Sequence, residues 1–299
     1  MLISRREALL QSAVPLLAQA RPSIAITMDD VHWEYIPEDR RSEAEDRLLS
    51  HLSKTQAFLF AAGGAVDNPH GAAIMKSWSA AGHRIGNHTY SHKVSNKMKP
   101  EEFEADILRC EGVLRGYSGF RKWFRFPALK EGQTSELRDR FRSFLARHNY
   151  RNGPITVDAS DWYYNQRLIS RLTAERGFDV SRYREPYLAH VWDRAQFYDQ
   201  LSRQVLGRSV PHTLELHYNL VNALFLGDLL RMFRSKGWGV IDAEEAFSDQ
   251  VFTRQPHTAP AGESLLWALA KETGKFADRL RYPGESGEYE KPLLDRLGL

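Results

Sequence analysis

The sequence lacks the features that mark several common classes of protein. It contains one cysteine in 299 residues, Cys110, which excludes an intramolecular disulfide and a zinc site built from cysteines. Lysine and arginine (41) nearly balance aspartate and glutamate (38) along the chain, so we expect no nucleic-acid partner. We detect no internal repeat, no low-complexity segment and no apolar run long enough for a stable membrane span. These absences predict an ordinary globular chain in which Cys110 is a small core residue.

The first 20 residues have the pattern of an export signal. Arg5 and Arg6 precede a short apolar stretch over residues 8–17, and the segment ends in Ala18-Gln19-Ala20. A basic start, an apolar middle and an Ala-x-Ala end are typical of a secretory signal, and the paired arginines indicate the twin-arginine route. We predict a signal peptide over residues 1–20 and a periplasmic or extracellular protein. The alternative is an amphipathic leader helix on a cytoplasmic protein.

Strand-like and helix-like segments alternate along the rest of the chain. Short β-rich runs predict strands at residues 23–28, 55–62, 83–87, 122–126, 155–157, 213–216 and 238–241. Helical spacing predicts helices at residues 42–52, 71–81, 101–114, 136–149, 194–206 and 223–233. This alternation is typical of a parallel α/β sheet, whose ligands bind beyond the C-terminal ends of the strands. We assign residues 21–247 to a catalytic domain and residues 248–299 to an extension packed on it, and the oligomeric state stays open.

Polar side chains gather at these strand ends, and two histidines among them have the spacing of metal ligands. Asp29 and Asp30 end the first strand, whereas His88 and His92 follow the third. Two imidazoles four residues apart on one helical turn would project from the same face. Imidazole nitrogens with a carboxylate oxygen suit zinc, and also cobalt, nickel or manganese. We therefore predict a divalent metal, with Zn²⁺ as the first candidate and Co²⁺, Ni²⁺ or Mn²⁺ as alternatives.

The paired carboxylates Asp29 and Asp30 must have different tasks, because consecutive residues at a strand end point to different sides. One can bind the metal while the other takes a proton from metal-bound water, or the pair can simply cap a turn. His217 ends a late strand and can protonate a leaving group, or it can be a hydrogen-bonded structural histidine. Arg125 stays charged and can pair with a site carboxylate or form a surface salt bridge.

Five segments resemble, in order, the motifs of the polysaccharide deacetylases, also known as carbohydrate esterase family four or the NodB homology domain. They are residues 27–30, 82–92, 125–127, 158–162 and 214–217. The second is the most specific, and the resemblance spans about residues 22–245. It implies a distorted, incomplete (β/α) barrel of about seven strands. It also implies a metal-dependent hydrolase that removes N-acetyl groups from amino-sugar residues of a glycan or oligosaccharide.

The resemblance further implies a role for each matching residue. The implied metal ligands are Asp30, His88 and His92. The implied catalytic residues are the general base Asp29, the general acid His217, and their respective partners Arg125 and Asp161. The expected substrate-binding residues are Trp162, Pro127, Trp33 and Tyr163. Aromatic faces stack on sugar rings, which favours the aromatic members of this set, although core packing explains such residues equally well.

The chain departs from the family pattern in two motifs. Val31 follows the Asp pair where the family usually has glycine, and His32 comes next. In the third motif, Ala128-Leu129 follows the proline where a glycine normally closes the motif. Both changes alter the rim of the site and leave the substrate open. The alternatives are an amidase acting on a small non-sugar amide or imide and a non-catalytic glycan-binding relative. His32 could contact substrate or metal or be a solvated loop residue, and residues 190–194 are interpreted as a loop near the site.

Overall fold

The computed structural model describes residues 21–278, 280 and 287–299, so the predicted signal peptide lies outside the described residues. Its centre is a seven-stranded parallel sheet in the order β6-β4-β3-β2-β1-β7, with β8 also paired to β1. The strands of this sheet are β1 (Ser23–Asp30), β2 (Phe58–Ala61), β3 (Arg84–Asn87), β4 (Phe120–Phe124), β6 (Arg151–Asn152), β7 (Pro211–His217) and β8 (Gly239–Val240). A small antiparallel pair joins β5 (Lys130–Gly132) to β9 (Ala261–Gly262).

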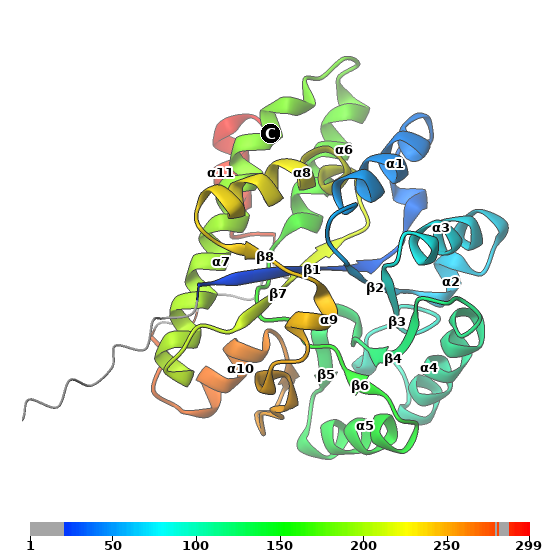
Figure 1. Cartoon of the computed structure of the whole chain (residues 1–299), viewed down its shortest axis with the longest axis vertical. Coiled ribbons are helices and arrows are strands. Elements are labelled where there is room, and N and C mark those ends of the chain that lie inside the picture. The colour runs from blue at the N-terminus through cyan, green and yellow to red at the C-terminus, as the bar shows by residue number, and fades with distance from the viewer. Residues whose placement is uncertain (1–20, 279, 281–286) are drawn as a thin grey trace, which may run out of the picture.

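The α-helices lie around the outside of this sheet (Figure 1). In the described part of the chain they are α1 (Arg41–His51), α2 (Gly63–Val66), α3 (Pro69–Ala80), α4 (Pro100–Leu114), α5 (Ser135–Arg147), α6 (Asp161–Ala174), α7 (Arg184–Leu206), α8 (Leu220–Ser235), α9 (Ala243–Ala246), α10 (Leu265–Glu272) and α11 (Lys291–Leu297). None of these helices combines the length and the apolar character that a membrane crossing requires.

One segment nearly closes the sheet into a ring. Arg151 of β6 pairs with Trp123 of β4, and a few residues later Val157 bridges to Leu214 of β7. The stretch that carries β6, one end of the strand order, therefore also contacts β7, the other end. The ring is closed by a single bridge instead of a complete strand, so the barrel is incomplete. The fold class expected from the resemblance is confirmed.

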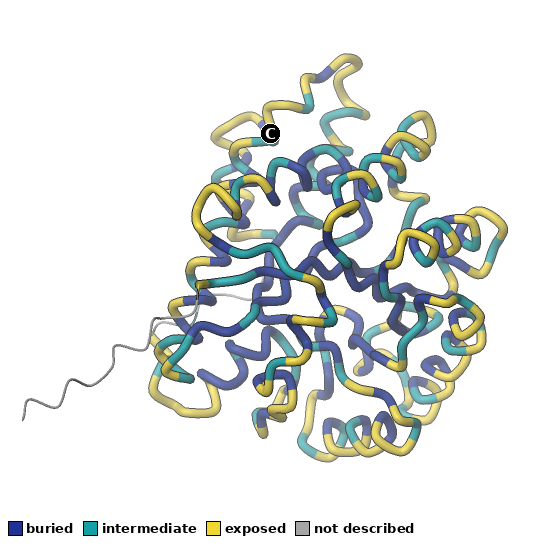
Figure 2. Tube along the Cα trace, in the orientation of Figure 1, coloured by how far each residue is buried: buried dark blue, intermediate teal, exposed yellow. Residues whose placement is uncertain are grey.

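Strand β1 is the centre of the sheet. Its residues Ile24–Asp29 are buried, as expected for a parallel strand covered on both faces, and Figure 2 shows this buried centre beneath exposed helices. Strand β7 pairs along β1 from Ser23 to Asp29. Strand β8 pairs with β1 at Ser23 and Ile24, whereas β2 pairs with it from Thr27 onward. The carboxyl end of β1 is thus fixed between β2 and β7, and it places two carboxylates at one edge of the sheet.

Three features of the structure differ from the sequence-based expectations. The segment predicted as a loop, residues 190–194, lies inside helix α7, and helix α6 was not predicted. The buried face of α7 includes Tyr187, His190, Arg194 and Tyr198. These residues follow helical spacing but are not aliphatic, so a search for apolar periodicity misses them. The segment predicted as a strand at 155–157 contributes only the single bridge of Val157.

Residues beyond 247 pack against the ring-closing segment. The Leu265 N–H donates to the Ile155 carbonyl at 2.8 Å, and Ser264 Oγ donates to the Thr156 carbonyl at 2.9 Å. Helix α10 also packs on α7. These contacts support the segment that follows β6, while the division of the chain at residue 247 stays a prediction. Cys110 is fully buried, and burial raises the pKa of its thiol to about 12.

We expect Gly86→Ala to destabilise the protein. A Cβ at position 86 would lie 2.6 Å from Phe60 Cδ1 and 2.8 Å from Phe58 Cε1, and these two rings are stacked at 4.7 Å. Overpacking of a filled core costs about 1–3 kcal/mol, which urea unfolding would measure. Gly112→Ala is the matched control, because its Cβ meets nothing within 4 Å in helix α4. It should stabilise the protein by about 0.4–1 kcal/mol, and equal effects of the two changes would contradict this packing.

Candidate metal centre and active site

Asp30 lies at the centre of the site. Its Oδ1 is 2.8 Å from His92 Nε2 and 3.3 Å from His88 Nε2. Yet this oxygen is buried and has no partner with hydrogen-bond geometry in the described residues. Burial raises the pKa of Asp30, but the charge of His92 and the contacts with both imidazoles outweigh it and hold the pKa well below its usual value. A buried anionic oxygen near two imidazole nitrogens, yet outside hydrogen-bond geometry, fits a shared divalent cation.

The two histidines reach Asp30 by a route that the sequence did not predict. Residues 88–92 form an irregular loop, so the predicted helical turn was wrong. Thr89 and His92 have left-handed backbones, with φ of 63° and 54°. The loop is held by the Asn87 side chain, which accepts the Thr89 N–H, and by Thr89 Oγ1, which accepts the His92 N–H. The two imidazole rings still lie close together, with centroids 4.9 Å apart.

Asp29 forms a buried ion pair on the inner side of the site. Arg125 Nη1 donates to Asp29 Oδ1 at 2.6 Å and to Thr27 Oγ1 at 2.9 Å, and Nε donates to the Gly153 carbonyl at 2.8 Å. The other carboxylate oxygen, Oδ2, lies 3.8 Å from His88 Nε2. Arg125 thus supplies the counter-charge that a buried carboxylate requires and leaves one oxygen of Asp29 facing His88.

A second carboxylate–histidine pair stands at the end of β7. His217 Nδ1 lies 2.8 Å from Asp161 Oδ1, and the His217 N–H donates to Oδ2 at 2.8 Å. The side-chain amides of Asn219 and Asn222 donate to the same Oδ2. Burial lowers the pKa of His217, but the charge of Asp161 and its hydrogen bond outweigh this effect, so the pKa is raised well above its usual value. His217 is therefore equipped to carry a proton through Nε2.

These groups surround one cavity of about 290 Å³. It is lined by Asp29, Asp30, His88, His92, Ala128, Leu129, Asp158, Ala159, Trp162, Glu215 and His217. Of the four predicted substrate-binding residues, Trp162 lines the cavity, whereas Pro127, Trp33 and Tyr163 do not.

The other predicted substrate-binding residues have structural contacts of their own. Trp33 Nε1 donates to the Ala65 carbonyl at 3.1 Å, and the Tyr163 hydroxyl accepts from Arg167 at 3.3 Å. Pro127 is buried beside the cavity-lining Ala128 and Leu129. Their roles in substrate binding stay predictions.

Sequence reasoning assigned no role to two carboxyl groups that line the cavity, Glu215 and Asp158. Glu215 precedes His217 by two residues on β7, so the alternation of a strand places both on one face, and this signal could have found it. Burial and the nearby charges of Asp29 and Asp158 raise the pKa of Glu215 well above its usual value. The Asp158 carbonyl accepts from Arg194 Nε at 2.7 Å, which connects helix α7 to the site.

Comparison with known proteins identifies the region that carries this geometry. Residues 18–152 match the family described as polysaccharide deacetylase. That region is similar to the polysaccharide deacetylases. It contains the first three motifs with Asp29, Asp30, His88, His92 and Arg125, while Asp161 and His217 lie beyond it.

Two peptidoglycan-N-acetylglucosamine deacetylases of Bacillus cereus are similar to about half of this chain. One is 29% identical over 143 residues, which cover 48% of this chain and 47% of the relative. The other is 23% identical over 150 residues, which cover 50% of this chain and 51% of the relative. The chain thus spans about half the length of the curated relatives that it matches.

Solved structures show the same fold over a longer stretch. A peptidoglycan N-acetylglucosamine deacetylase superposes with a TM-score of 0.51 and 20% identity, over 78% of this chain and 91% of its own. A carbohydrate esterase family four pseudoenzyme from Bacillus anthracis gives 0.52 and 17%, over 76% of this chain and 66% of its own. At these identities the likeness shows the fold alone.

We expect Asp161→Asn to lower the pKa of His217, because it removes the charge that stabilises the imidazolium and leaves burial unopposed. NMR titration of the metal-free protein would measure this change. The pKa of His217 is higher in the folded than in the unfolded protein. The His217–Asp161 pair therefore stabilises the folded protein fully below the ordinary histidine pKa of about 6.5, and this contribution to the free energy of unfolding is lost as the pH rises through the raised pKa. The exposed Asp39→Asn is the control. An equal pKa of His217 in the wild type and in D161N would contradict the pairing.

Proposed function

We propose that the chain is a metal-dependent deacetylase that hydrolyses the N-acetyl groups of amino-sugar residues in a glycan or oligosaccharide. One observation carries the proposal. Around a single cavity, the Asp30 group with its two imidazoles stands between two proton-transfer pairs, Asp29–Arg125 and His217–Asp161. Hydrolysis of an amide needs these three functions, namely activation of water, a base, and an acid for the leaving amine.

The cation would be held by Asp30, His88 and His92. When bound, it supplies a Lewis acid that acidifies water and stabilises the developing oxyanion. Asp29 takes the proton of the attacking water on Oδ2, because Oδ1 is already occupied by Arg125. His217 then gives the proton on Nε2 to the amine nitrogen as the bond to the acetyl carbon breaks, while Asp161 holds Nδ1. Acetate and a free amino sugar leave the site.

The proposed substrate is supported by the relatives and by the lining of the cavity. The curated relatives are named for deacetylation of N-acetylglucosamine in peptidoglycan. Trp162 offers an aromatic face to a sugar ring, and the acidic groups Asp158 and Glu215 can bond to hydroxyl groups. We further propose that the protein is exported, on the basis of the pattern in residues 1–20.

A second candidate is an amidase acting on a small amide or imide. It is favoured by the altered third motif, because the cavity is lined by Leu129 and Ala128. Both residues have positive φ, 56° and 49°, where the family pattern has a glycine. The apolar Leu129 side chain fills part of the rim and would suit a compact substrate.

We expect Asp29→Asn to retain metal and to lose about 10²–10⁴-fold in kcat, because the amide cannot accept the proton of water. Metal content and acetate release from N-acetylglucosamine oligomers measure the two effects. Asp39→Asn makes the same chemical change at an exposed position and should leave both unchanged. Undiminished acetate release by D29N would show that another group is the base.

We expect chelation to abolish turnover, and Zn²⁺, Co²⁺, Ni²⁺ or Mn²⁺ to restore it to different extents. The assay compares N-acetylated oligosaccharides, peptidoglycan fragments and small cyclic imides with the same enzyme. Acetate release from the glycans alone supports the proposal, whereas turnover of the imides alone supports the second candidate. Turnover that survives complete removal of metal would contradict both.

A further inference from the structure

A strained turn brings one more histidine to the metal centre. Asp30 and Val31 have φ of 79° and 63°, so two consecutive residues other than glycine have left-handed backbones. Val31 is β-branched and fully buried, and such a residue adopts this conformation only when its surroundings enforce it. The Val31 N–H donates to the Asp29 carbonyl at 3.1 Å, and the Trp33 N–H donates to the Val31 carbonyl at 2.9 Å. The chain thus turns sharply after β1, and His32 follows directly.

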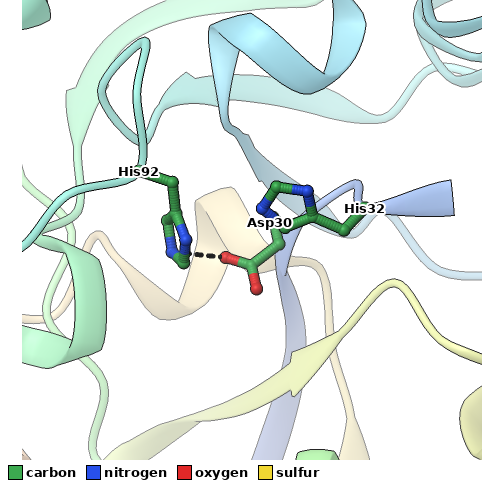
Figure 3. Close-up of side chains that lie close together, drawn as sticks. All are labelled: Asp30, His32 and His92. Atoms are coloured by element: carbon green, nitrogen blue, oxygen red, sulfur yellow. Dashed lines mark ion pairs between the residues drawn. The ribbon is translucent and has the colours of Figure 1, made fainter. Parts of the chain in front are cut away.

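His32 lies beside the ligands already described. One ligand atom each from Asp30, His32 and His92 lies within 4.8 Å of the other two. The rings of His32 and His92 meet edge to face, with centroids 5.3 Å apart at 65°. Figure 3 shows the two rings on either side of the Asp30 carboxylate. A cation between these three side chains would lie against the same Asp30 carboxylate that approaches His88.

The Glu34 carboxylate contacts one ring nitrogen of His32. His32 Nδ1 is 3.0 Å from Glu34 Oε1, so Nε2 is the nitrogen left for another partner. A carboxylate behind an imidazole fixes its orientation and raises its basicity, which is the usual support of a metal-bound histidine. The segment carrying both residues is anchored by Trp33, which donates to Ala65 and packs under Arg41. A solvated loop histidine would need none of these constraints.

We propose that His32 is an additional protein ligand of the site cation, with Glu34 as its positioning residue. The inference rests on the proposed function for the existence of the cation at Asp30. A third imidazole adds affinity and occupies a coordination position. In a tetrahedral ion such as Zn²⁺ this leaves little room for water, whereas five- and six-coordinate ions such as Co²⁺ or Ni²⁺ retain open positions. This chain is therefore expected to favour metals of higher coordination number.

The test is a Co²⁺ titration of the metal-free protein, read by competition with a chelator and by visible absorption. We expect His32→Ala to weaken Co²⁺ binding by about tenfold or more and to change the intensity of the absorption bands. Glu34→Gln keeps the imidazole and should weaken binding less. The side chain of Glu34 is 41% exposed, so this variant should fold even if H32A does not. His257→Ala is the control, because it removes an exposed histidine outside the site.

Each outcome decides between the two proposals. Weaker Co²⁺ binding and an altered spectrum in H32A, with a smaller effect in E34Q and none in H257A, support the ligand role. If wild type binds Co²⁺ and releases acetate while H32A and E34Q match it in affinity and spectrum, the inference about His32 fails alone. If wild type binds no Co²⁺, Zn²⁺, Ni²⁺ or Mn²⁺, the metal centre itself fails, and the proposed function fails with it.

Discussion

The guanidinium of Arg125 connects most of the parts from which the site is built. It donates to Asp29 on β1 and to the Gly153 carbonyl on the ring-closing segment, and it lies 4.0 Å over the Phe60 ring of β2. The carbonyl of the same residue is 2.9 Å from Nδ1 of His88. A charge this deeply buried is tolerated only with partners on several sides. The closure of the barrel and the geometry of the site are therefore one constraint, because the residue that pairs with Asp29 also contacts the His88 ring through its carbonyl.

Three of the histidines at the site are oriented in the same way. His88, His217 and His32 each have Nδ1 engaged from behind, by a main-chain carbonyl in the first case and by carboxylates in the other two. With one nitrogen engaged, the ring orientation is fixed and Nε2 is available toward the site. The kind of partner then sets the chemistry. At His217 the partner is the buried carboxylate of Asp161, which favours the protonated ring and raises its pKa.

The sequence predicted the parts that depend on short-range pattern. The apolar run at residues 24–28 ends where the structure places Asp29 and Asp30, since a buried strand and its polar terminus are both local features. The loop from His88 to His92 could not be predicted, because its backbone is also held by residues distant in sequence. The Gly63 N–H donates to the Thr89 carbonyl, and the Tyr90 N–H donates to the Asp106 carbonyl. The first part of α7, before the predicted helix at residues 194–206, was also missed, because its buried face combines Leu188 and Val191 with tyrosine and histidine side chains that are less regularly buried.

The pairing of β1 constrains how the chain can fold during synthesis. Strands β2, β3 and β4 follow β1 closely in the sequence, so this half of the sheet can form early. The opposite edge of β1 can pair only after β7 (residues 211–217) has been synthesised. The first residues of β1 can pair with β8 only after residues 239–240 have been synthesised. Until the ribosome has released most of the chain, a buried, apolar strand has an open edge. Contacts this distant in sequence slow folding and prolong the exposure of this strand edge to aggregation.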